Sequence, residues 1–96
     1  MEPVRTGLRN LMSSLLRARP AEEAVVLAWP LVCGKEVAAR TEAVGFFHGV
    51  LTVDVPDPTW RIQLSAFAAK YVSGFNELLG PIVNEVKFKI ANSNLQ

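Results

Sequence analysis

The sequence predicts an α+β fold in which helices cover one face of a small three-stranded mixed sheet. Two segments with apolar residues at three- and four-residue spacing come first, and the period changes to two between residues 42 and 56. A long helical segment and a strictly alternating strand follow, so the expected order is α-α-β-β-α-β in two layers. We expect one domain spanning residues 1–96.

The connection between the last two strands predicts how they pair. A single helix joins them, so they should run parallel with a right-handed crossover. The sequence leaves open whether the third strand pairs beside the second or on the far side of the first.

Composition places the chain among globular proteins. Half of its 96 residues are hydrophobic, a fifth are charged and the formal net charge is +1, which by itself does not indicate a nucleic-acid partner. The single cysteine, Cys33, cannot form an internal disulfide, which fits a reducing cytoplasm. No apolar run approaches the ~18 residues of a membrane span, and arginines interrupt the N-terminal leucines. We therefore expect a cytoplasmic protein without membrane contact.

Residues 4–18 are predicted to form the first helix, and Arg19-Pro20 should end it because the residue before proline disfavours the α conformation. One row of this helix is basic. It is either a solvated face or a surface that contacts phosphates or a partner. The apolar stripe comprises Leu8, Leu11, Met12, Leu15 and Leu16, and the basic row comprises Arg5, Arg9 and Arg17.

Residues 21–40 are predicted to form a second helix, in one piece or two. Glutamates at its start favour the N-terminal turn. Pro30 should kink the helix, and Gly34 favours a break near Cys33. Trp29 lies within an apolar run, so we interpret it as a core anchor rather than a platform for a ligand.

Residues 43–47 and 50–55 are predicted to be strands joined by a turn at His48-Gly49. His48 is interpreted as a turn residue, because ligand histidines are accompanied by partner ligands. In the second strand, apolar and polar residues point to opposite faces, with Leu51, Val53 and Val55 on one face and Thr52 and Asp54 on the other.

A long helix is predicted from Pro58 to Leu79. Asp57 is its N-cap candidate, and a proline at the first helical position loses no hydrogen bond. Gly80-Pro81 provides the stop signal. The broad apolar stripe of this helix is predicted to be core rather than a surface for stacking bases. The stripe comprises Trp60, Leu64, Phe67, Tyr71, Phe75 and Leu78.

Residues 82–90 are predicted to form the last strand, followed by a short polar tail. One face should cover the helices, and the other should meet water or a partner. The first face comprises Val86, Phe88 and Ile90, and the second comprises Glu85, Lys87 and Lys89.

Few residues of this sequence indicate catalysis. Cys33 and His48 are the nucleophile and base candidates, and Cys33 lies in an apolar stretch where a thiol is usually inert. No Cys/His cluster has zinc spacing, and no GxGxxG or Walker loop is present. We expect no enzyme activity, metal, cofactor or small-molecule substrate, and a hydrolase built on these two residues is the weakest hypothesis.

Three segments in this order resemble one family. They are the stretch from Trp29 to Gly34, the block from Gly49 to Leu64 with Trp60 at the start of its helix, and the strand from Val86 to Lys89. Together they resemble the DciA family of bacterial proteins over residues 8–90. Trp29, Gly34 and Trp60 match positions of the family pattern, and packing and turning are their expected roles.

This resemblance implies a KH-like fold and a role in bacterial DNA replication, with recruitment or loading of the DnaB-type replicative helicase and DNA binding. Many members have a polar-x-proline step before the first strand, where this chain has Arg40-Thr41-Glu42-Ala43. Many also have a disordered extension implicated in helicase contact, whereas this sequence ends at Gln96. The GxxG loop of nucleic-acid-binding KH domains is absent, so KH-style clamping of a nucleic-acid backbone is not expected.

Two functions follow as hypotheses. In the first, a non-enzymatic replication accessory protein contacts the helicase and single-stranded or forked DNA. Its predicted phosphate-contacting residues are Arg5, Arg9, Arg17, Arg19, Lys87 and Lys89. In the second, the chain is a protein-interaction module without nucleic-acid binding, which the near-neutral charge and the mixed outer sheet face favour.

Overall fold

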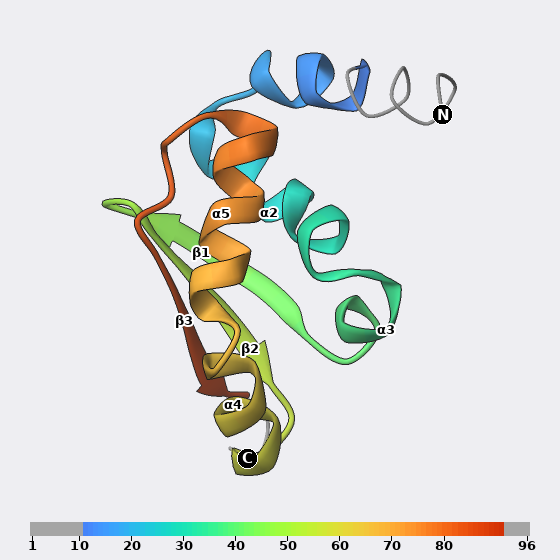
Figure 1. The fold of residues 1–96 in the computed structure, drawn as a ribbon, viewed down its shortest axis with the longest axis vertical. Helices are drawn as coiled ribbons and strands as arrows, with labels where there is room; N and C mark the ends of the chain where they lie inside the picture. Colours follow the sequence, from blue (N-terminus) through green and yellow to red (C-terminus); the bar gives the residue numbers. More distant parts are fainter. Residues whose placement is uncertain (1–10, 92–96) are drawn as a thin grey trace.

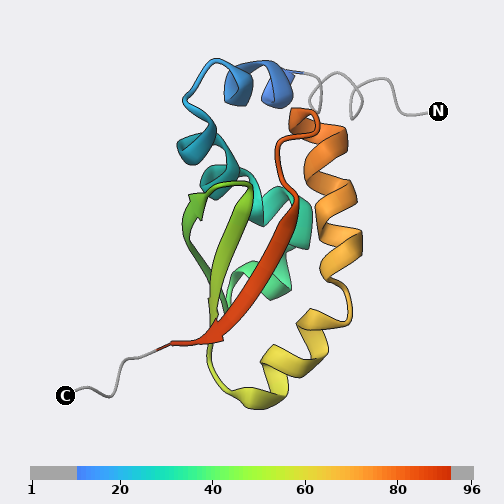
Figure 2. The ribbon, with the colours of Figure 1, turned by 90° about the vertical axis from the view of Figure 1, so that its left-hand side faces the viewer.

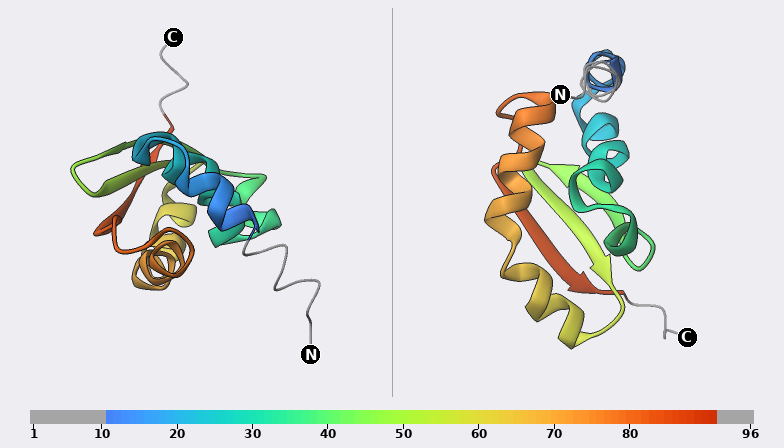
Figure 3. Two further views of the ribbon diagram at one scale, coloured as in Figure 1. Left: turned by 90° about the horizontal axis from the view of Figure 1, so that it is seen from above. Right: turned by 45° about the vertical axis from the view of Figure 1, so that its right-hand side comes forward.

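The computed structural model describes residues 11–91, and its three-stranded sheet has helices packed against it (Figure 1). The strands have the order β1-β2-β3 and are formed by Glu42–Phe47, Val50–Val55 and Glu85–Ile90. Figures 2 and 3 show that the helices gather on one side of this sheet. The predicted α+β fold with a three-stranded mixed sheet is confirmed, and it is consistent with a KH-like arrangement.

Residues 11–17 form the first described helix, which ends before Arg19-Pro20 as predicted. The start of the predicted helix, residues 4–10, lies outside the described residues. Leu16 is buried, whereas Leu11 and Leu15 are 55% and 58% exposed. The apolar stripe is therefore only partly covered, because this helix lies across one end of the molecule rather than flat on the sheet (Figure 1).

The second predicted helix consists of two helices, α2 (Ala21–Cys33) and α3 (Lys35–Ala38). The break is at Gly34, whose φ of +92° is incompatible with an α-helix and disfavoured for residues with a side chain. Pro30 lies inside α2, and its carbonyl accepts the Gly34 N–H at 3.1 Å. The predicted break near Cys33 is confirmed, and it occurs at the glycine rather than at the proline.

His48 and Gly49 form the turn between β1 and β2 as predicted, and both have positive φ, +51° and +80°. A side chain at position 49 would also collide with the side chain of Asn84. The backbone N–H of Asn84 donates to the Gly49 carbonyl at 2.8 Å, so the turn is held against the segment that enters β3. On β1, a bulge between Ala43 and Gly45 shifts the register with β2.

β3 pairs with β2 in parallel, so the predicted direction is confirmed and the strand lies beside the second strand rather than beyond the first. The predicted start at residue 82 is wrong, because β3 begins at Glu85. Residues 82–84 instead carry the chain from the helical layer into the sheet. The N–H groups of Asn84 and Glu85 both donate to the Gly49 carbonyl, at 2.8 and 3.2 Å. These hydrogen bonds mark where the pairing of β3 with β2 starts.

Trp29 is buried at the centre of the core, between the helices and the sheet. Its ring lies 5.1 Å from Tyr71, 6.3 Å from Phe75 and 6.1 Å from Phe88, measured between ring centroids. Trp29 of α2 therefore packs against aromatic side chains from both the helix at residues 68–79 and β3. The sheet contributes its predicted apolar face, Leu51, Val53 and Val55, all almost fully buried.

The helix predicted over residues 58–79 is two helices, α4 (Pro58–Ser65) and α5 (Ala68–Leu79). The prediction of one continuous helix is wrong, because a tight turn intervenes in which the Phe67 N–H donates to the Leu64 carbonyl at 2.9 Å. α4 packs against β2 and β3, whereas α5 packs against α2 and β3, so the turn redirects the chain between two sets of neighbours. Phe67, predicted to be core, is consequently 49% exposed.

Candidate partner-binding surfaces

Arg17, a predicted phosphate contact, meets the C-terminal end of α5. Its guanidinium donates to the Leu78 carbonyl at 3.3 Å, and the Ser13 hydroxyl donates to the same oxygen at 2.6 Å. A cation near a helix C-terminus is favoured by the helix dipole by about 0.3–1 kcal/mol at exposed sites. Arg17 therefore has a stabilising contact within the fold, although the residue as a whole remains exposed.

Arg19 forms an ion pair with Glu23 at 3.1 Å, one helical turn further along the chain. Both side chains are 52% exposed, so the pair contributes only about 0.3–0.5 kcal/mol. Arg17 and Arg19 line the same shallow cleft, together with Leu79 and Ile82. The structure thus brings these two predicted residues together at one end of the molecule.

Lys87 and Lys89 lie on the face of the sheet opposite the helices. Their neighbours on β2 are Thr52 and Asp54, and Lys89 Nζ is 2.7 Å from Asp54 Oδ1. Lys87 has no ion-pair or side-chain hydrogen-bond partner among residues 11–91. The charged residues of this open face are mixed in sign, with Glu42, Asp54 and Glu85 against Lys87 and Lys89. The open face is therefore not a positively charged surface.

The predicted cations consequently occupy two separate regions. Arg17 and Arg19 lie where the first helix meets the end of α5, and the two lysines lie along β3 (Figure 1). Arg5 and Arg9 lie outside the described residues. The role of all six cations in nucleic-acid binding stays a prediction.

The three positions that match the family pattern all have structural contacts. The Trp29 indole N–H donates to the Thr41 hydroxyl at 2.9 Å, and Gly34 separates α2 from α3. Trp60 is in the first turn of α4, where its backbone N–H donates to the Asp57 carboxylate at 2.9 Å. Asp57 is therefore the N-cap, as predicted, and Trp60 packs partly buried against the core.

Cys33 and His48 do not come together. Cys33 ends α2 and His48 is in the β1–β2 turn, and Figure 1 shows these places apart. Burial raises the pKa of the Cys33 thiol to about 11, and a backbone hydrogen bond at Cys33 opposes this only in part. A thiol with this pKa is protonated at neutral pH and is a poor nucleophile. Both observations argue against the hydrolase hypothesis.

Two other kinds of site can be assessed over the described part of the chain. Within residues 11–91, no three His, Cys, Asp or Glu side chains lie close enough together to hold a metal ion. No helix of the same range has both the length and the apolar character needed to cross a membrane.

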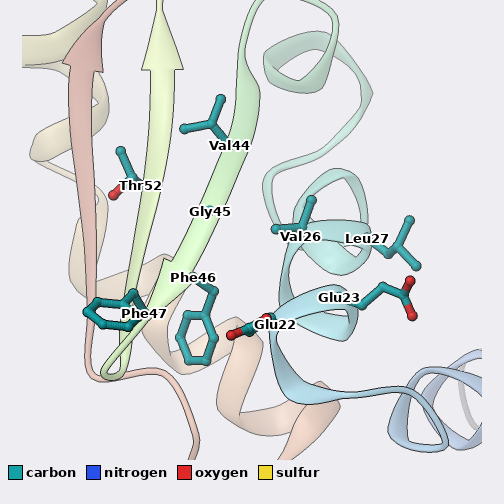
Figure 4. A pocket seen from close by; sticks show the side chains of 9 residues that line it. All are labelled: Glu22, Glu23, Val26, Leu27, Val44, Gly45, Phe46, Phe47 and Thr52. Atoms are coloured by element: carbon teal, nitrogen blue, oxygen red, sulfur yellow. The ribbon is translucent and has the colours of Figure 1, made fainter.

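A hollow on the described surface runs along the outer edge of β1, and the sequence reasoning missed it. This β1-edge groove has a volume of about 710 Å³ (Figure 4). Phe46 and Phe47 flank the strand there, and Figure 4 shows Phe46 pointing toward α2 and Phe47 pointing the other way. Adjacent aromatics on one strand point to opposite faces, so this pair was the available signal. The full lining is Glu22, Glu23, Val26, Leu27, Val44, Gly45, Phe46, Phe47 and Thr52.

These features define a class of protein, a small α+β domain with a three-stranded mixed sheet and exposed apolar and charged side chains. The sequence profile of one family, described as Dna[CI] antecedent, DciA, matches residues 3–88. The match covers nearly the whole chain, and the chain belongs to the DciA family. The resemblance found from the tryptophans and the alternating strands is therefore confirmed.

Family membership indicates a role in loading the DnaB-type replicative helicase, in a family of accessory rather than catalytic proteins. A comparison with curated proteins found no match. The three positions that resemble the family pattern, Trp29, Gly34 and Trp60, have packing and turn roles and do not identify a partner surface.

Proposed function

We propose that this chain recruits or loads the DnaB-type replicative helicase and makes auxiliary contacts with single-stranded or forked DNA. The family match over residues 3–88 is the observation that carries this proposal. The described surface supports a partner-binding role, because it exposes an apolar groove and large apolar side chains outside the core.

The DNA contact is proposed for the basic residues at the two regions described above. Arg17 and Arg19 share one cleft, and Lys87 has no ion-pair partner among residues 11–91, so its ammonium group could meet a phosphate. Each phosphate contact releases about one condensed counterion, so the affinity should fall as salt rises. Arg5 and Arg9 belong to the same proposal as the N-terminal part of the basic row.

Co-elution on a sizing column tests the helicase half. The full chain and the DnaB-type helicase from the same organism should elute together, and a mixture that separates at micromolar concentrations would contradict recruitment. The Arg5→Ala, Arg9→Ala, Arg17→Ala triple variant should still co-elute if the helicase surface lies elsewhere.

Titration of fluorescent single-stranded and forked DNA at two salt concentrations tests the DNA half. Lys87→Ala should weaken binding uniformly across sequences and lower the salt slope by about one. Lys70→Ala on α5 removes the same charge from an exposed site outside both regions and serves as the control. Equal losses in the two variants would mean that only net charge matters.

A protein-interaction module without DNA binding is the second candidate. The observation that favours it is the charge balance of the open sheet face, where acidic residues outnumber basic ones. Arg17, Arg19 and Lys89 are also engaged within the fold. Absence of DNA binding at low salt, together with intact co-elution, would establish this candidate and remove the DNA contact.

A further inference from the structure

The outer edge of β1 carries backbone groups that no neighbouring strand uses. The sheet has the order β1-β2-β3, so β1 pairs with β2 alone and its other side is free within the described residues. A free edge of this kind is a template for another extended segment, which would add to the sheet through main-chain hydrogen bonds.

The β1-edge groove follows this free edge and is lined from both sides of the strand. Val26 and Leu27 of α2 and Phe46 line the helical side, and Val44, Phe47 and Thr52 line the open side. Successive side chains of a strand point in opposite directions. A strand beside β1 would therefore place one set of side chains against α2 and the other set against the open face.

The groove is exposed apolar surface. Leu27 is 47% exposed, Val44 is 44% exposed and Phe47 is 70% exposed. On β1, Gly45 lies between Val44 and Phe47. A side chain added at Gly45 would meet nothing within 4 Å, so the strand edge is accessible from the open face. Clustered exposed apolar side chains of this kind mark a site for a partner.

Charge decides what kind of partner fits. Glu22 and Glu23 are the only charged residues among those that line the groove, in a chain whose net charge is +1. Glu23 is already paired with Arg19 at 3.1 Å, so the carboxylate of Glu22 is the one that a partner would meet. Figure 4 shows Glu22 beside Phe46 at the end of the strand near the turn. Phosphates would be repelled by this rim, whereas lysine or arginine side chains would be attracted to it.

We infer that the β1-edge groove binds an extended polypeptide segment of apolar and basic residues, which adds to the sheet as a fourth strand beside β1. Main-chain hydrogen bonds hold the segment, apolar side chains fill the space against Leu27 and Phe46, and a basic side chain pairs with Glu22. The inference concerns a protein partner and does not require that this partner be the helicase.

A second copy of the chain fits this edge less well than a short segment does. The bulge at Val44 interrupts the regular edge, and bulges limit edge-to-edge pairing of whole sheets. An antiparallel pair of β1 strands would also bring the Glu22 end of one copy toward Glu42 at the start of the other strand. A short peptide needs only the regular part from Gly45 to Phe47.

The test uses the isotope-labelled full chain and a synthetic seven-residue peptide of alternating valine and lysine, followed by NMR. Saturable shifts are expected at the amides of residues 44–47 and 22–27. A peptide of alternating valine and glutamate should bind at least about tenfold more weakly, which corresponds to about 1.4 kcal/mol. No saturable shift at millimolar peptide, or equal binding of the two peptides, would overturn the inference.

Matched variants locate the site. Leu27→Ser should weaken peptide binding about tenfold, whereas Ile62→Ser, at an equally apolar and 68% exposed position on α4, should leave it unchanged. Glu22→Lys should weaken binding of the lysine peptide, whereas Glu77→Lys makes the same charge change on α5, outside the groove, and should not. Equal effects within either pair would contradict the assignment.

Two further outcomes would replace the peptide by another occupant. Dimerisation of the chain alone in sedimentation experiments, abolished by Leu27→Ser, would assign the groove to a second copy. Shifts of the same amides on addition of single-stranded DNA would assign it to nucleic acid. Either result overturns the inference, and neither depends on whether the chain co-elutes with the helicase.

Discussion

Trp29 and Thr41 are joined by a hydrogen bond that links the middle of α2 to the start of β1. The indole N–H donates to the Thr41 hydroxyl oxygen at 2.9 Å, and that hydroxyl donates to the Val37 carbonyl at 2.8 Å. The only polar atom of a side chain that is otherwise packed against three aromatic rings is thereby satisfied.

Replacing Thr41 by a residue of the same shape should show how much this hydrogen bond contributes to the free energy of unfolding. Thr41→Val leaves a buried indole N–H without a partner, which should lower the free energy of unfolding by about 1–3 kcal/mol. Thr41→Ser keeps the hydroxyl and should lose less than half of that. Urea unfolding followed by tryptophan fluorescence measures both, and a Val variant as stable as the wild type would contradict the role of this bond.

Asp57 should contribute measurably to the stability of α4. Its carboxylate accepts the Trp60 N–H at 2.9 Å, and replacement of a capping residue by alanine costs about 0.5–2 kcal/mol. Asp57→Ala should therefore lower the urea midpoint, whereas Asp57→Asn retains a capping oxygen and should lie close to the wild type. Similar losses in the two variants would assign the effect to charge rather than to capping.

Gly49 should tolerate alanine far less well than Gly45. Gly49 has φ of +80°, so Gly49→Ala should cost about 1–3 kcal/mol from backbone strain, and the side chain of Asn84 would have to shift to make room. Gly45 has open space around it, and alanine there should change the free energy of unfolding by less than about 0.5 kcal/mol. Thermal unfolding of both variants makes the comparison, and the reverse order would contradict the geometry of the turn.

Cys33 should react slowly with thiol reagents in the folded chain. A rise of its pKa from 9.0 to about 11 lowers the thiolate fraction at pH 8 by about 100-fold. The rate of alkylation should therefore be far below that of the urea-unfolded chain at pH 8, and it should rise toward pH 11. A folded chain that reacts as fast as the unfolded one would refute the burial of this thiol.

The raised pKa of Cys33 also makes the stability of the fold depend on pH. Because folding raises the pKa of the thiol, the neutral form is favoured in the folded state. The contribution to stability is fully present below pH 9.0 and is lost as the pH rises toward about 11. Cys33→Ala should remove this part of the pH dependence, as urea unfolding at pH 8 and pH 11 would measure.

Local signals in the sequence were sufficient for most of the fold. The His48-Gly49 turn, the Asp57 cap and the break at Gly34 depend on residues whose backbone preferences act within a few positions. Strand alternation likewise identified Leu51 and Val53 as core, since a one-residue shift would expose both.

The turn between α4 and α5 had no such signal. Neither glycine nor proline occurs at residues 66–67, and the aromatic spacing continues through them. The chain changes direction there because both helices contact β3 but only α4 contacts β2 and only α5 packs against α2, which is a property of the tertiary structure. Phe67 was placed in the core for this reason, although it is half exposed.

The candidate site was less accessible from the sequence than the fold. Arg17 was assigned to a basic row, and its contact with the Leu78 carbonyl joins residues 61 positions apart. The pairing of Lys89 with Asp54 likewise depends on which strands are neighbours. The β1-edge groove is formed by residues of both α2 and β1, which are brought together only by the fold. The adjacent Phe46 and Phe47 were its only local signal in the sequence.

The parallel pairing of β2 with β3 has a consequence for how the chain folds as it is synthesised. β1 and β2 meet through a two-residue turn, whereas residues 56–84, which contain α4 and α5, separate β2 from β3. Contacts this far apart close slowly, because the intervening chain must be ordered first. A nascent chain on the ribosome therefore keeps the central strand open along one edge, and the place of Val86 in the core empty, until its last strand emerges.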